Sequence, residues 1–119
     1  MAAVHFHLEN RVAVITGGAQ GIGAACASRF ARDGAAVAIW DVNDELGHAL
    51  AQQLEANGAR VVYCHCNVSR KDEVDAALAA TRQALGAVDA LVNNAGIFKA
   101  ADFLDITEAD WTAVLDVNL

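Results

Sequence analysis

Residues 12–23, Val-Ala-Val-Ile-Thr-Gly-Gly-Ala-Gln-Gly-Ile-Gly, constrain the fold more than any other stretch of this chain. The first four are apolar and mostly β-branched, which is typical of a buried strand. Glycine then fills positions 17, 18, 21 and 23, and apolar residues recur at helical spacing beyond them. The pattern predicts a strand that turns sharply into a helix, without side chains where another molecule comes close. The free N–H groups and positive dipole end of that helix favour an anion, most often a phosphate.

Apolar strands and amphipathic helices alternate along the rest of the chain. We expect strands over residues 11–16, 36–40, 60–66 and 89–93, and helices over 21–32, 43–56, 69–85 and from 107 to the end. Fully apolar strands indicate a parallel sheet with helices on both faces. With 119 residues, the chain is at most one domain. We therefore predict an α/β, doubly wound (Rossmann) sheet of order 3-2-1-4, with a ligand crevice between the first and fourth strands.

Residues that favour helix starts stand at the expected boundaries. Asn43 and Thr107 are expected to cap the second and fourth helices, and Ser69 with Asp72 resembles a capping box for the third. The apolar residues expected on the inner face of the second helix are Leu46, Ala49, Leu50 and Leu54.

Composition narrows the classes of partner. A net charge of −7 argues against nucleic acid and against anionic membrane surfaces, which attract basic proteins. A phosphate would then be held by main-chain N–H groups. No apolar run reaches the roughly 18 residues of a membrane span, and the first residues do not resemble a signal peptide. Three cysteines without a regular spacing suit free thiols in a reducing compartment, so we expect a cytoplasmic protein.

Two short motifs suggest a metal and are interpreted otherwise. His5 and His7 lack a third ligand, and a surface segment is the favoured interpretation. Cys64 and Cys66 would share one face of a strand while His65 points to the other, so the three are not expected to grip one ion. No metal site is predicted.

The spacing Thr16-Gly17-x-x-x-Gly21-x-Gly23, joined to Asn93-Asn94-Ala95-Gly96, closely resembles the short-chain dehydrogenase/reductase family over essentially the whole chain. The three-residue gap between Gly17 and Gly21 favours its compact branch. The resemblance implies an oxidoreductase with a nicotinamide cofactor that transfers hydride between an alcohol and a carbonyl. The positions that match the family's cofactor-binding segments are Gly17, Gln20, Gly21, Ile22, Gly23, Asn94, Ala95 and Gly96. The alternative is a glycine-rich turn that only packs a helix on a strand.

Asp41 ends the second strand about 20 residues beyond the glycine turn. A carboxylate there can accept hydrogen bonds from the adenosine ribose hydroxyls, whereas a 2′-phosphate would meet like charge. Neither Gln20 nor the residues after Asp41 supply a compensating cation, so we predict NAD(H) over NADP(H). The alternative is an aspartate that caps the next helix.

Three further residues match the family's pattern. Asn67 and Val68 stand where the family commonly has an Asp-Val pair beside the adenine, and the Asn67 oxygen can still accept from the adenine amino group. Asn118 matches the helix asparagine that helps to hold a water in the catalytic proton relay. The family's serine, and its tyrosine with a lysine four residues later, have no counterpart, since the only tyrosine is Tyr63 with Asn67 four positions on.

The helix from Thr107 is still running at Leu119. We therefore expect the amino-terminal portion of an NAD-dependent oxidoreductase, inactive in isolation. Two alternatives remain: a stand-alone, non-catalytic dinucleotide-binding or regulatory module, and a structural partner that completes its sheet with another chain. The resemblance also implies a small-molecule alcohol or carbonyl substrate and a homo-oligomer for an intact enzyme.

Overall fold

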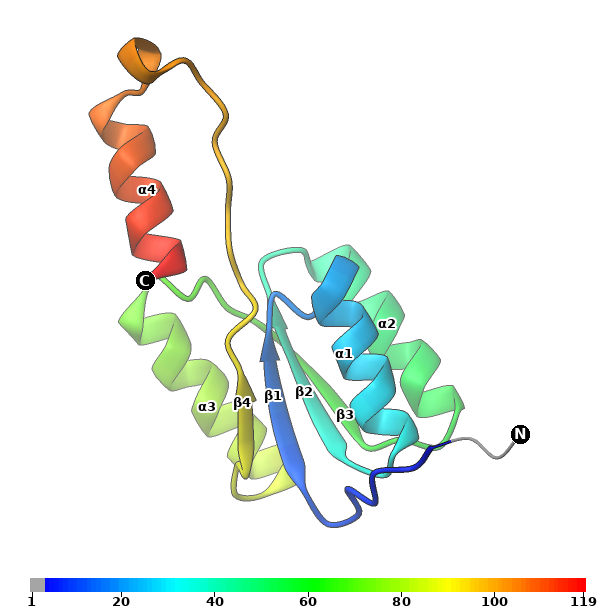
Figure 1. The fold of residues 1–119 in the computed structure, drawn as a ribbon. Helices are drawn as coiled ribbons and strands as arrows, with labels where there is room; N and C mark the ends of the chain where they lie inside the picture. The colour runs from blue at the N-terminus through cyan, green and yellow to red at the C-terminus, as the bar shows by residue number, and fades with distance from the viewer. Residues whose placement is uncertain (1–3) are drawn as a thin grey trace.

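The computed structural model describes residues 4–119 (Figure 1). Its elements are β1 (Val12–Thr16), α1 (Gly21–Arg32), β2 (Ala36–Asp41), α2 (Asp44–Ala56), β3 (Val61–His65), α3 (Lys71–Leu85), β4 (Ala90–Val92), a short 3-10 turn (Phe103–Asp105) and α4 (Glu108–Asn118). All strand pairs are parallel and the order is β3-β2-β1-β4. The predicted doubly wound α/β fold and its strand order are confirmed.

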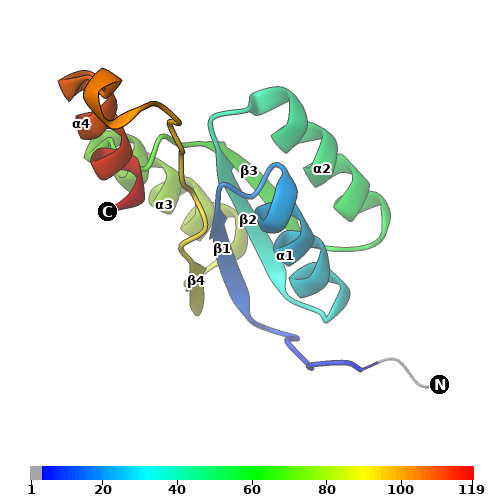
Figure 2. The ribbon, with the colours of Figure 1, turned by 45° about the horizontal axis from the view of Figure 1, so that its top comes forward.

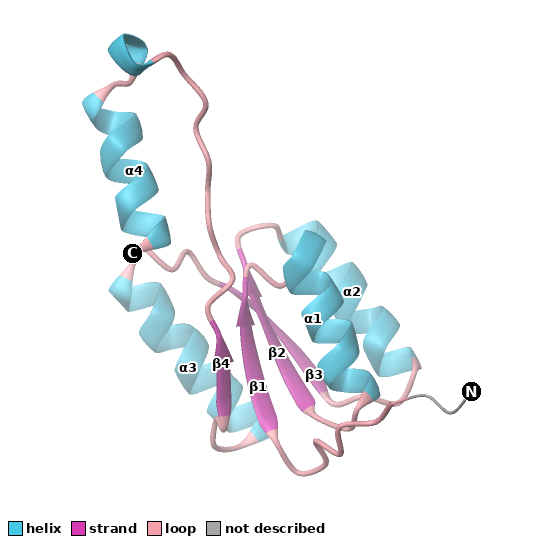
Figure 3. Cartoon of the chain, in the orientation of Figure 1, coloured by secondary structure: helices cyan, strands magenta, loops and turns pink. Residues whose placement is uncertain are grey.

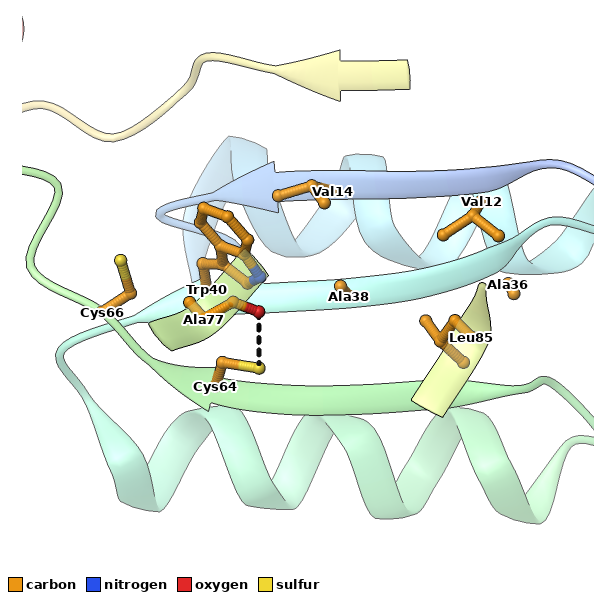
Figure 4. Close-up of a cluster of buried hydrophobic side chains, with 9 residues drawn as sticks. All are labelled: Val12, Val14, Ala36, Ala38, Trp40, Cys64, Cys66, Ala77 and Leu85. Atoms are coloured by element: carbon orange, nitrogen blue, oxygen red, sulfur yellow. Dashed lines mark hydrogen bonds between the residues drawn. The ribbon is translucent and has the colours of Figure 1, made fainter. Parts of the chain in front are cut away.

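The sheet has a hydrophobic core on each face. Helices α1 and α2 cover one face and α3 covers the other (Figure 3). On the α3 side, Trp40 lies in one cluster with Val14 and Cys64 (Figure 4). The indole N–H of Trp40 donates to the Oγ1 of the fully buried Thr81 at 3.0 Å. On the other side, Ile15 and Ile39 pack against α1 and α2. Both central strands are thus buried on two faces, as their continuous apolar sequence predicts.

The chain leaves β1 and β4 in different directions at the carboxyl edge of the sheet. β1 continues into α1 over one face, whereas β4 continues into a long extended segment that reaches α4, beyond the edge of the sheet (Figure 2). This divergence of neighbouring strands opens the crevice expected for a doubly wound sheet.

The helix starts agree with the sequence at two of three positions. Asn43 Oδ1 accepts from Leu46 N at 3.1 Å, and Thr107 Oγ1 accepts from Asp110 N at 3.1 Å, so both predicted caps are present. The predicted capping box at Ser69 is wrong. Helix α3 begins at Lys71 without a side-chain cap, because the Ser69 hydroxyl donates to Asn67 Oδ1 instead.

The predicted inner face of α2 is correct in part. Leu54 is buried and Leu50 packs against the core, as predicted, whereas Leu46 and Ala49 are exposed and the buried positions on this face also include Gly47 and Ala51. A Cβ atom on Gly47 would overlap the Tyr63 ring of β3. Because glycine has no Cβ, the Tyr63 ring can lie directly against the helix. A search for apolar periodicity does not count glycine and therefore misses this contact.

Replacing Gly47 with alanine is expected to lower the free energy of unfolding by about 1–3 kcal/mol, because the new methyl group would overlap the Tyr63 ring, whose hydroxyl is held by a hydrogen bond. The Tyr63 hydroxyl donates its one proton to Asp44 Oδ1 at 2.6 Å and lies 2.7 Å from Asp41 O. In an unconstrained helix the same change stabilises by about 1 kcal/mol. Equilibrium urea unfolding measures the sign. In a Tyr63→Ala background the substitution should become stabilising, and stabilisation of the wild-type chain would contradict the packing.

None of the described helices is both long and apolar enough to cross a bilayer.

Candidate functional site

A cleft of about 420 Å³ lies at the carboxyl edge of the sheet, where the ends of β1, β2, β3 and β4 meet. It is lined by Gly17, Gln20, Asp41, Val42, Cys66, Asn67, Val68, Asn94, Ala95, Gly96, Ile97 and Val117. The structure therefore brings together most of the predicted cofactor-binding residues, from four separate segments. A larger hollow, of about 860 Å³, lies at the opposite edge and includes Arg11, Arg32 and Arg60. None of the predicted site residues lines it.

The first turn of α1 follows Gln20, which lines the cleft, and has an open main chain; Gly21, Ile22 and Gly23 themselves are not among the lining residues. Gly21 has φ +59°, and a Cβ placed on it would meet nothing within 4 Å. No side chain caps the helix at Gln20, and Ile22 is 77% exposed. A left-handed residue beside empty space, at an uncapped helix start, fits a diphosphate approaching the main-chain N–H groups.

Gly23 and Gly17 serve packing within the turn. A Cβ on Gly23 would overlap Gly17 O and lie 2.6 Å from Asn94 Nδ2, and one on Gly17 would lie 2.9 Å from Ala95 Cα. The start of α1 therefore touches the main chain of the turn at Gly17, and Gly17 in turn touches the main chain of the segment after β4. These close contacts explain why positions 17 and 23 are glycine, and no ligand is needed to account for them.

Thr16 joins the two glycine-containing segments through its side chain. Its buried Oγ1 accepts from Asn94 N and from Ala95 N, both at 3.0 Å, and donates to Val92 O at 3.3 Å. The Asn94 side-chain amide adds two hydrogen bonds between the same segments, since its Nδ2 donates to Thr16 O and to Gly17 O, both at 3.1 Å. Thr16 was not among the predicted site residues, although a lone hydroxyl at the end of an apolar strand was a visible signal.

Asp41 is oriented by main-chain donors on both sides. Its Oδ2 accepts from Ala19 N at 3.0 Å, and its Oδ1 accepts from Val42 N at 2.7 Å and from Asn43 N at 3.0 Å. Since a carboxylate offers about four acceptor positions, Oδ2 retains capacity for one more donor in the cleft. The cap of α2 is Asn43, so the alternative of Asp41 as that helix cap does not hold.

The Asn67 side chain is engaged differently from the expectation. Its Oδ1 accepts from Ser69 N at 3.0 Å and from Ser69 Oγ at 2.7 Å, which uses both lone pairs of the amide oxygen. The expected acceptance from an adenine amino group would require Ser69 to move. The amide N–H groups remain the donors that Asn67 can offer to the cleft.

The Asn118 side chain is bonded to the segment after β4. Its Oδ1 accepts from Ile97 N at 2.8 Å, and its Nδ2 donates to Ile97 O at 3.0 Å. These two bonds tie the last turn of α4 to the residue that follows Gly96. Asn118 thus fixes the wall of the cleft, whereas its expected part in a proton relay stays a prediction.

A network of ionisable groups lies behind Asp41, on the outer edge of the sheet. Asp44 Oδ1 accepts from Tyr63 OH at 2.6 Å and lies 2.7 Å from His65 Nδ1. These two hydrogen bonds lower the pKa of Asp44 below its usual range. The hydrogen bond to Asp44 and its charge raise the pKa of His65, while burial raises that of Tyr63.

The His65–Asp44 pair predicts a stability that falls as the pH rises through neutrality. A folded pKa above the unfolded value of about 6.5 means that the contribution is complete below pH 6.5 and is lost as the pH passes through the folded pKa. Thermal unfolding of the wild-type chain between pH 6 and 8 should therefore show a steeper decline than that of Asp44→Asn. The His48→Gln control should keep the wild-type slope. Parallel profiles for wild type and Asp44→Asn would contradict the pair.

Cys64, in β3, and Cys66, just after it, are both buried in the core, as predicted, whereas His65 between them is exposed. Burial raises the pKa of the Cys66 thiol to about 11 and also raises that of Cys64. Both thiols are therefore protonated near neutral pH.

Comparison with known proteins agrees with this geometry. A model of the family described as short chain dehydrogenase matches residues 11–119. The chain belongs to the short-chain dehydrogenase family. It is 42% identical to tropinone reductase-like 2 of Erythroxylum coca over the whole chain and 44% of the relative, and 39% identical to secoisolariciresinol dehydrogenase of Forsythia intermedia over the whole chain and 43% of the relative.

A solved short chain dehydrogenase from Burkholderia cenocepacia, in complex with NADP, superimposes with a TM-score of 0.90 at 40% identity. The match covers 95% of this chain and 46% of that one. This short-chain dehydrogenase chain therefore spans under half the length of the relatives that it matches.

Proposed function

We propose that this chain forms the NAD-binding part of an oxidoreductase that interconverts a secondary alcohol and a carbonyl by hydride transfer. The observation that carries the proposal is the position of Asp41, which ends β2 in the same cleft as Gly17 and Asn94. The uncapped start of α1 would hold the diphosphate, and the free acceptor position on Asp41 Oδ2 would hold a ribose hydroxyl. The nicotinamide ring supplies the hydride chemistry when it is bound.

The preference for NAD(H) over NADP(H) rests on charge. The described residues that line the cleft include Asp41 but no lysine or arginine. A 2′-phosphate beside Asp41 would therefore meet a negative charge with no cation to offset it, and a unit charge pair 4 Å apart near a protein surface interacts by about 4 kcal/mol. The Burkholderia cenocepacia relative was solved with NADP. Cofactor preference in this chain is accordingly proposed from Asp41 and not from that relative.

Catalysis by the isolated chain is not expected. The hydroxyl of the only tyrosine, Tyr63, donates to Asp44 Oδ1 and lies 2.7 Å from Asp41 O, behind the cleft, and no lysine follows Tyr63 four residues later. A tyrosine acts as a general acid or base near neutral pH only when a neighbouring charge lowers its pKa, and the pKa of Tyr63 is raised. Incubation with NAD⁺ and a panel of secondary alcohols should give no NADH, and measurable turnover would contradict this part of the proposal.

Equilibrium dialysis of the purified chain against NAD⁺ and NADP⁺ tests the binding proposal. We expect weak but measurable NAD⁺ binding and weaker NADP⁺ binding. Asp41→Asn should reduce the ratio of the two affinities by about tenfold or more, because it removes the charge that repels the 2′-phosphate. Glu45→Gln, a matched loss of one exposed charge on the first turn of α2, should leave the ratio unchanged. Tighter NADP⁺ binding by the wild-type chain would overturn the NAD assignment.

A further inference from the structure

A cluster of potential metal ligands lies outside the cleft, on the segment that precedes β1. His5, His7 and Glu9 each place one ligand atom within 4.8 Å of the others, and all three residues are exposed. The sequence alone supplied two histidines without a third ligand. The structure adds Glu9, and none of these residues has a part in the proposed dinucleotide site.

The segment that carries the cluster is fixed to the end of α1. Leu8 N donates to Asp33 O at 2.8 Å, and Arg29 Nη2 donates to Val4 O at 2.9 Å. The Arg29 guanidinium also lies over the Phe6 ring, 4.8 Å from its centre. The main chain that carries the three ligand residues is therefore held in place by contacts with the folded domain.

The spacing of the ring nitrogens suits a shared ion. His5 Nδ1 and His7 Nδ1 are 3.2 Å apart, and Glu9 Oε1 lies 3.9 Å from His7 Nδ1. In a tetrahedral zinc site with Zn–N distances of about 2.0–2.1 Å, neighbouring ligand atoms are roughly 3.3 Å apart. The two imidazole nitrogens already approach that separation, although His5 Nδ1 accepts from His7 N at 3.1 Å and would exchange this hydrogen bond for the ion. Glu9 Oε1 lies 3.9 Å from both His7 Nδ1 and His5 Nε2, and the exposed Glu9 side chain would have to turn toward the pair to become the third ligand.

A second, independent observation lies directly beneath the cluster. The Asp33 side chain is 1% exposed, and its Oδ1 has no hydrogen bond of ordinary geometry within residues 4–119, although the main-chain N–H of Phe6 faces the carboxylate. The other oxygen, Oδ2, accepts from Arg29 Nε at 2.7 Å. The unpartnered Oδ1 lies 3.9 Å from His5 Nε2, on the side of the ring opposite to His7.

This placement matches the support that metal-bound histidines usually have. A histidine that binds a metal through Nδ1 carries its proton on Nε2 and donates it to a carboxylate, which fixes the ring and its tautomer. Asp33 Oδ1 is a buried acceptor 3.9 Å from that nitrogen, and a shift of the His5 ring toward it would complete the hydrogen bond. An ion bound to His5 would therefore give the orphaned carboxylate oxygen a partner.

We propose that His5, His7 and Glu9 bind a divalent transition-metal ion of the Zn²⁺ type, and that Asp33 is a positioning residue for His5. Two imidazoles and one carboxylate favour zinc and its neighbours over Ca²⁺ or Mg²⁺, which take oxygen ligands. Three protein ligands leave a fourth position for water. The ion would clamp the amino-terminal segment onto the end of α1, at the opposite edge of the sheet from the dinucleotide cleft.

Titration of Zn²⁺ into the 119-residue chain tests the proposal, with a chromophoric chelator as competitor. The chain is purified without a polyhistidine tag and treated with EDTA beforehand. We expect one ion per chain. His7→Ala and Glu9→Gln should each weaken binding by more than about tenfold, and Asp33→Asn by about 10–100-fold. His48→Gln and Glu55→Gln, matched changes at exposed positions outside the cluster, should bind as the wild type does.

Two further readouts make the result decisive. Co²⁺ in place of zinc should give the strong visible absorption of a four-coordinate ion in the wild-type chain and lose it in His7→Ala. Zinc should raise the melting temperature of the wild type but not of His7→Ala. His7 and Glu9 are exposed, so these variants should fold, and circular dichroism checks this even where Asp33→Asn is destabilised. Absence of one-to-one binding, or unchanged affinity in both His7→Ala and Glu9→Gln, would overturn the proposal.

Discussion

Replacing Gly23 with alanine is expected to lower the free energy of unfolding by about 3 kcal/mol and to abolish dinucleotide binding. The new methyl group would overlap Gly17 O and press on Asn94 Nδ2. Neither atom has free space, because the Asn94 amide donates to Thr16 O and Gly17 O. Helix α1 would have to move away from the turn, and the main-chain N–H groups at its start would move with it.

Chemical denaturation and equilibrium dialysis with NAD⁺ measure the two effects of Gly23→Ala. Ala25→Leu offers a matched control, since it adds a larger side chain to the exposed face of the same helix. Its free energy of unfolding should stay within about 0.5 kcal/mol of the wild-type value. A Gly23→Ala chain as stable as the wild type would mean that β1 and α1 are not in the close contact described.

Replacing Thr16 with valine is expected to destabilise the chain by about 2–4 kcal/mol, although the two side chains have nearly the same shape. The hydroxyl accepts from Asn94 N and Ala95 N and donates to Val92 O. Valine would leave both N–H groups without their acceptor, at about 1–3 kcal/mol for each buried group. The segment after β4 would then detach from β1, and the cleft would lose one wall.

Thr16→Ser separates the hydrogen bonds from the shape of the side chain. Serine keeps the hydroxyl and loses one methyl group, so most of the stability should return, and NAD⁺ binding with it. Equilibrium urea unfolding of the three chains gives the comparison. Equal stability of Thr16→Val and wild type would show that Thr16 does not hold the two segments together.

Elements whose signals lie close together in the sequence could be predicted. The apolar strands and the residues that end helices predicted a parallel sheet. Its strand order could also be predicted, since right-handed crossovers leave few possible topologies. The crevice followed from that order, which is why Gly17, Asp41 and Asn94 meet in one cleft. The caps at Asn43 and Thr107 depend on a side chain and an N–H group three residues later, and both were correct.

Features that depend on contacts between distant segments could not be predicted. The burial of Gly47 against Tyr63 adds to the inner face of α2, and no periodicity within the helix signals it. Ser69 resembled a helix cap in the sequence, but its hydroxyl donates to Asn67 Oδ1 in the preceding turn and caps no helix. The third ligand beside His5 and His7 also appears only in three dimensions, because the turn of the main chain at His7, with φ 54°, helps to bring Glu9 to the pair.

The central claim is that main-chain N–H groups at the start of α1 hold the diphosphate while Asp41 holds the adjacent ribose. Titration of the ¹⁵N-labelled chain with NAD⁺, followed by amide chemical shifts, tests it most directly. We predict the largest shifts at Gly21, Ile22 and Gly23 and around Asp41. Shifts confined to the opposite hollow, near Arg11, Arg32 and Arg60, or no shifts at all, would contradict the claim.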